Sequence, residues 1–187
     1  MNLAPLMIPL AIAAVTLLVF LADLAVKEDN GRGLGALATI GLVAVLGLSF
    51  VTPMGSAFGG AYLQDDFALY VQRIVLLAGI LGCLGSMDHA SKYFPGRQGE
   101  YYLMLLFSMV GMAVIPAAKE LVLLIVAFEL MGIPLYVLAA MHKKLAAGIE
   151  GTWKLYLTGA VSSVITLYGL SFIVGSTGTT DLNSLAE

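Results

Sequence analysis

The 187-residue chain is 60% hydrophobic and only 11% charged, with a mean hydropathy of +0.97, the composition of an integral membrane protein. Its net charge of −3, with nine basic residues spread over several loops, excludes the clustered basic face of a nucleic-acid-binding protein. A single cysteine, Cys83, excludes an intrachain disulfide and a cysteine-rich metal or cluster site. His89 and His142 lie far apart in polar segments, so we expect no metal site.

Six apolar runs predict an all-α, polytopic membrane protein with six transmembrane helices in a single membrane domain, residues 1–187. The expected helices are residues 3–22, 34–51, 67–87, 101–118, 121–141 and 149–174. Residues 175–187 are expected to form a polar tail at which a longer chain is cut short.

The basic residues predict the orientation of these helices. The loops after the first, third and fifth helices hold six lysines and arginines, whereas the other loops and the tail hold only Lys119. Short loops rich in Lys and Arg remain in the cytoplasm. We therefore expect both termini to lie outside and the segments around Lys27, Lys92 and Lys143 to lie in the cytoplasm.

The fifth run, residues 121–141, carries a carboxylate near its middle, Glu129. An ionisable group at the centre of a membrane costs roughly 2.5 to 3.5 kcal/mol on insertion scales, so it usually has a partner and a function. Five residues later, Pro134 cannot donate to the carbonyl of Leu130, and we expect the helix to bend or loosen there. A carbonyl freed in this way can hold a water molecule beside Glu129.

A second charge, Lys154, falls early in the sixth run. At about 1.5 Å per residue from the shared cytoplasmic end, Glu129 is roughly 18 Å deep and Lys154 roughly 8 Å, an offset that a long lysine chain or water can bridge. The pair is a candidate for proton handling, whereas the structural alternative is a buried ion pair that fixes helix register.

Small residues recur at helical spacing in the third and sixth runs and allow close approach of helix backbones. We assign them to helix packing and not to ligand binding. They are Gly79, Gly82, Ser86, Gly159, Ser163, Thr166 and Gly169.

Three stretches from about residue 99 to 182 carry a resemblance to a known family. They are GEYYLMLLFSMVGM, AAKELVLLIVAFELMGIPLYVLAA and IEGTWKLYLTGAVSSVITLYGLSFIVGSTGTTDL. Over this range the chain resembles subunit N of NADH-quinone oxidoreductase, respiratory complex I. The acid of the family's E-L-x-x-x-P-L-Y pattern falls on Glu129, with Pro134 in place. The E-A-x-x-K-Y motif falls on Glu150 and Lys154, although Gly151 replaces its alanine.

The resemblance implies the N-terminal portion of an antiporter-like fold of about fourteen helices in two inverted repeats. It implies a proton-translocating subunit in the bacterial inner membrane, driven by quinone reduction elsewhere in the complex, with Glu129 and Lys154 as proton relays. It implies no cofactor and no metal in this chain, because NADH, flavin, iron–sulfur clusters and quinone bind to partner subunits. The expected partners are the other membrane subunits and the lipid bilayer.

Two alternatives remain open. One is the related antiporter-like subunit of a cation/proton exchanger or a membrane-bound hydrogenase. The other is a non-conducting assembly scaffold in which the intramembrane charges are purely structural.

Overall fold

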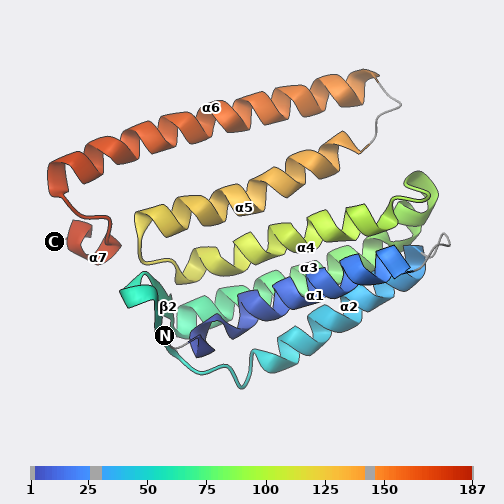
Figure 1. Ribbon diagram of the computed structural model, residues 1–187, viewed down its shortest axis with the longest axis horizontal. Helices are drawn as coiled ribbons and strands as arrows, with labels where there is room; N and C mark the ends of the chain where they lie inside the picture. The colour runs from blue at the N-terminus through green and yellow to red at the C-terminus, as the bar shows by residue number, and fades with distance from the viewer. Residues whose placement is uncertain (1–2, 26–30, 142–145, 187) are drawn as a thin grey trace.

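The computed structural model describes residues 3–25, 31–141 and 146–186, which form long helices lying side by side (Figure 1). In chain order the elements are η1 (Ala4–Leu6), α1 (Met7–Ala25), α2 (Gly31–Leu48), β1 (Gly55–Ala57), η2 (Phe58–Gly60), β2 (Tyr62–Gln64), α3 (Asp66–Tyr93), α4 (Gln98–Val114), η3 (Ile115–Ala117), α5 (Leu121–Ala140), α6 (Ala146–Thr177) and α7 (Leu182–Ala186). The expected loop residues Lys27, His142, Lys143 and Lys144 lie outside the described residues.

Each of the six expected helices is present. Among the described helices, five are long and apolar enough to cross a membrane, and the second, Arg32–Leu48, is a shorter apolar helix. Seventeen residues are at the lower end of the range of about 17 to 25 that spans a bilayer. The prediction of a helical, multi-pass membrane protein is therefore confirmed.

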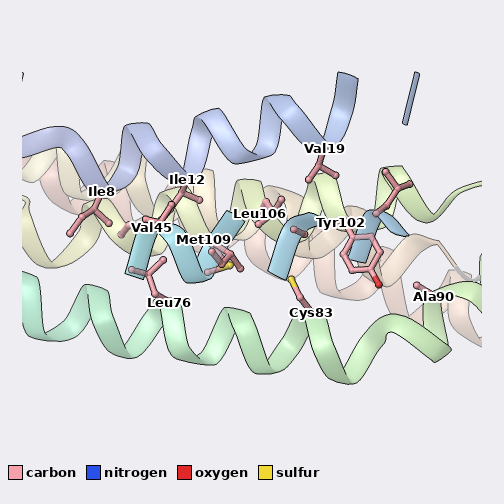
Figure 2. Close-up of a cluster of buried hydrophobic side chains, with 14 of the residues drawn as sticks. Ile8, Ile12, Val19, Val45, Leu76, Cys83, Ala90, Tyr102, Leu106 and Met109 are labelled. Carbon is pink, nitrogen blue, oxygen red and sulfur yellow. The ribbon is translucent and has the colours of Figure 1, made fainter. Parts of the chain in front are cut away.

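Helices α1 to α4 share one core, part of which is drawn in Figure 2. The buried residues of α1 are Ile8, Pro9, Ile12, Thr16 and Val19, and the spacing of Ile8, Ile12, Thr16 and Val19 places these four on one face of the helix. On α3, a Cβ added at Gly79 would lie 2.0 Å from Met109 Cε of α4, so the Met109 side chain packs directly over this glycine. The prediction that Gly79 serves helix packing is confirmed.

Helices α5 and α6 lie side by side and extend the bundle outward from α4 (Figure 1). Helix α5 packs against α4, and α6 packs against α5. No residue in the most apolar window of α6 is buried within the described structure, compared with 39 to 44% of the corresponding windows in α1, α3 and α4. The face of α5 that carries Glu129 is consequently covered by a single helix.

A short antiparallel hairpin, β1 with β2, connects α2 to α3, where the sequence predicts only a loop. Its turn uses positive φ at Phe58, Gly59 and Gly60. Such backbone is readily adopted by glycine. Strands of three residues are too short for their alternation to be read from sequence, which is why the hairpin was not predicted.

A buried polar network fixes the hairpin to α3 and α4. Tyr62 donates to Gln64 Oε1 (2.8 Å), Gln64 Nε2 donates to Gln72 Oε1 (2.6 Å), and Gln72 Nε2 donates to the carbonyl of Ala113 (2.8 Å). Burial raises the pKa of Tyr62 to about 12, against a smaller opposing effect of its hydrogen bond with Gln72. The phenol therefore remains protonated and able to donate at neutral pH.

The segment after α6 is attached to the same end of the bundle, although the sequence predicts only a polar tail. The amide of Leu121 donates to the carbonyl of Thr180 (2.9 Å), and the amide of Leu182 donates to the carbonyl of Lys119 (3.0 Å). Thr180 also donates to the Glu120 carboxylate (2.7 Å). These bonds anchor the outer end of α6 to the connection between α4 and α5.

Arg73 on α3 closes the end of α2. Its Nη2 donates to the carbonyl of Ser49 (3.0 Å), its Nε donates to Ser49 Oγ (3.2 Å), and its guanidinium lies 4.5 Å from the centroid of the Phe50 ring. Carbonyls at a helix C-terminus lack intrahelical donors, and a guanidinium supplies the missing hydrogen-bond donors. Arg73 therefore has a structural role.

Candidate functional site

Glu129 lies near the middle of α5 and is half-buried. Ser163 of α6 donates its hydroxyl hydrogen bond to Glu129 Oε1. The sequence assigned Ser163 to helix packing, so this partner was missed. The sequence could have indicated this partner. At about 1.5 Å per residue, Glu129 lies roughly 18 Å from the loop that the two helices share, and residues 161 to 163 lie at about the same depth.

A pocket of about 350 Å³ opens beside Glu129 between α5 and α6. Glu129 is the only acid among its lining residues, and the other polar side chains in the lining all carry hydroxyl groups. The polar lining residues are Glu129, Tyr136, Ser162, Ser163 and Thr166. The arrangement places a titratable carboxyl group in contact with a space large enough for water, which is what a proton relay needs.

On the opposite side, α4 holds the backbone of α5 around Glu129. A Cβ added at Gly111 would lie 2.5 Å from Met131 N and 2.7 Å from the carbonyl oxygen of Ala127. Only glycine allows two backbones to approach this closely. Since Ala127 and Met131 face α4, the side chain of Glu129 between them points toward α6.

Ser108 of α4 reinforces this contact next to Pro134. Its hydroxyl donates to the carbonyl of Met131 (2.9 Å). Pro134 is buried within α5 and removes the donor for the carbonyl of Leu130. A weakened turn of α5 is therefore supported by a hydrogen bond from a neighbouring helix. The helix continues to Ala140 in the structure, and a water molecule on the freed carbonyl stays a prediction.

Lys154 is not brought to Glu129. Its ammonium pairs with Glu150 Oε1 one turn earlier on α6 (2.5 Å), and both side chains are mostly exposed. Lys154 and Ser163 are nine residues apart, which is about two and a half helical turns. Lys154 therefore lies on the face of α6 opposite to the face that contacts Glu129. In this arrangement Lys154 pairs with Glu150, and the expectation that a lysine chain or water bridges Lys154 and Glu129 stays a prediction.

The small residues of α6 have different surroundings. A Cβ added at Gly159 would lie 2.1 Å from Tyr136 Oη, whereas one added at Gly169 would meet no atom within 4 Å. The packing role predicted for Gly159 is confirmed. For Gly169, and for Gly82 on α3, the predicted packing role is wrong within the described structure, because an added Cβ at either would meet no atom within 4 Å. Within the described residues, no group of three or more His, Cys, Asp or Glu side chains is arranged to hold a metal ion.

Comparison with known proteins places this site in a family context. Residues 118–187, which include Glu129 and Ser163, match the family described as NADH:quinone oxidoreductase/Mrp antiporter, TM. Within respiratory complex I from Thermus thermophilus with bound aureothin, one chain superposes with a TM-score of 0.75 at 24% sequence identity, over 94% of this chain and 38% of that one. The likeness shows that the two share a fold.

Curated relatives match over the whole chain. NADH-quinone oxidoreductase subunit N of Desulforamulus reducens is 34% identical over 100% of this chain and 39% of the relative. The subunit N of Moorella thermoacetica is 37% identical over the same shares. The chain thus spans about two fifths of the length of these relatives. Along its entire length the chain is therefore similar to subunit N of NADH-quinone oxidoreductases.

Proposed function

We propose that this chain is part of a proton-translocating membrane subunit of an NADH-quinone oxidoreductase and that Glu129 carries protons within it. The observation that supports this most strongly is a carboxyl group midway along a transmembrane helix, in contact with a hydroxyl donor and a polar pocket. An intramembrane acid is costly to retain, and a purely structural role would be filled at lower cost by an apolar residue.

Lys154 is proposed as a second relay group. It lies on the opposite face of α6 and nearer the connection to α5, so it serves a part of the path beyond α6 and not a direct contact with Glu129. Its ammonium pairs with Glu150 at the surface of α6. A surface ion pair of this kind is weak, so Lys154 can change partners at small cost.

The partners follow from the same proposal. The named relatives are subunits of NADH-quinone oxidoreductases. We therefore expect NADH, flavin, iron–sulfur clusters and quinone to be bound by other subunits, and this chain to contribute proton transfer alone. The energy of quinone reduction would reach Glu129 through contacts between membrane subunits in a bacterial inner membrane.

Copurification tests the proposal. The full-length protein, tagged and extracted in mild detergent, should bring down other NADH-quinone oxidoreductase subunits together with NADH-oxidising, quinone-reducing activity. The alternative function is a subunit of a cation/proton antiporter, which is favoured by a matching family that includes Mrp antiporters. Recovery of antiporter subunits without redox activity would establish that alternative.

The topology gives a separate prediction. In Figure 1 the C-terminal ends of α1, α3 and α5 lie at one end of the bundle, and the hairpin lies at the other. Lys92 and Arg97 lie near the first end, whereas Lys119 lies near the hairpin. In a Cys83→Ser background, a cysteine replacing Lys92 should resist an impermeant thiol reagent added to sealed cells and react after lysis.

A cysteine replacing Phe58 in the hairpin is the matched control, because that side chain is exposed at the opposite end. It should react in sealed cells. Labelling of position 92 but not position 58 from outside would mean that the orientation is inverted.

A further inference from the structure

Ser163 has one hydroxyl hydrogen and two acceptors within reach. One is Glu129 Oε1 on α5, and the other is the carbonyl oxygen of Gly159, one turn earlier on α6 (3.0 Å). A serine hydroxyl donates one hydrogen bond and accepts others, so it donates to one of these oxygens at a time. The direction of the bond with Glu129 can therefore reverse without separating the two oxygen atoms.

The reversal matches the two charge states of a carboxyl group. An ionised Glu129 only accepts hydrogen bonds, and Ser163 then donates to it. A protonated Glu129 carries its own O–H, which donates to Ser163 Oγ while the serine hydrogen turns to the carbonyl of Gly159. We propose that Ser163 is a positioning residue that holds the Glu129 carboxyl at the same place in the pocket in both protonation states.

Among the described residues of the site, Ser163 is the one that holds the Glu129 side chain. Gly111 and Ser108 fix the backbone of α5 around Glu129, but they do not fix its side chain. A glutamate side chain has three rotatable bonds, and without a partner its carboxyl group samples several positions. The described polar bond between Glu129 and α6 is the one from Ser163. A relay depends on where its carboxyl lies, because proton transfer requires oxygen atoms within hydrogen-bonding distance.

This inference rests on the proposed role of Glu129 as a relay, and infrared spectroscopy tests it separately from pumping. The protein is the full-length subunit within its assembled complex in membranes. The carbonyl stretch of protonated Glu129 is identified as the band that is lost in Glu129→Gln. In Ser163→Ala this band should move to higher wavenumber, because the carboxyl group loses a hydrogen bond, and proton pumping should fall severalfold.

Two variants make the result specific. Ser163→Thr keeps the hydroxyl and should restore the band position and most of the pumping. Ser171→Ala makes the same chemical change on α6 at an exposed serine that bonds only to its own helix, at the carbonyl of Tyr168, and should leave both unchanged. These outcomes together would support a positioning role.

Other outcomes would overturn it. An unmoved band in Ser163→Ala would show that Ser163 does not hold the protonated carboxyl group. A shift of equal size in Ser163→Thr would show that bulk, and not the hydroxyl, matters. Normal pumping by Glu129→Gln would refute the proposed function instead, and the position of the band would still decide whether Ser163 holds Glu129.

Discussion

Replacing Gly111 by alanine is expected to separate α4 from α5 and to destabilise the protein more than an alanine at any open glycine. The added Cβ would lie 2.5 Å from Met131 N, 2.7 Å from the Ala127 oxygen and 2.9 Å from the carbonyl carbon of Leu130. All three are backbone atoms, which cannot rotate away. Overpacking a well-packed contact costs about 1 to 3 kcal/mol, and a backbone clash lies at the upper end of that range.

Gly82→Ala is the matched control. It makes the same change within α3, where an added Cβ would meet no atom within 4 Å. Alanine is a better helix former than glycine by roughly 0.5 to 1 kcal/mol, so this variant should be as stable as the parent or more so. The measurement is the midpoint of thermal unfolding of the full-length protein in detergent. Equal midpoints for Gly111→Ala and Gly82→Ala would contradict the close contact of α4 with α5.

The helices were predictable because membrane thickness sets their length, and an apolar run of sufficient length has few other stable structures. Their ends were less predictable. Helix α3 continues to Tyr93, beyond the expected end at residue 87, because polar residues also form helix once they leave the apolar layer. Hydropathy marks the boundary of the membrane and not the boundary of the helix. The attachment of residues 180–182 to residues 119–121 depends on backbone bonds between distant segments, which no local pattern reveals.

The site was predictable in part. Glu129 stands out because a charge within an apolar run is costly wherever the run folds. Ser163 does not stand out, since a serine in a membrane helix is equally suited to packing. Lys154 was placed by depth alone, and depth does not fix the rotation of a helix about its axis. Lys154 and Ser163 lie on opposite sides of α6, so the rotation of α6 about its axis decides which of them faces α5. Packing of Gly159 against Tyr136 sets that rotation.

Replacing Glu129 by glutamine is expected to leave the complex assembled and to reduce proton pumping severely. Glutamine preserves the volume and can still accept the hydrogen bond from Ser163, but it does not titrate. Glu129→Asp keeps the acid and shortens its reach by one methylene group, so it should retain part of the activity. Lys154→Ala should do less harm, because its ammonium pairs with Glu150 on the far face of α6 and does not contact Glu129.

The decisive measurement is proton uptake driven by NADH oxidation, recorded together with quinone reductase activity in membranes containing equal amounts of assembled complex. If Glu129 carries protons, Glu129→Gln should lose most of its proton uptake, Glu129→Asp should be intermediate, and Lys154→Ala should exceed both. Proton uptake by Glu129→Gln equal to that of the parent protein would contradict the account and remove Glu129 from the path.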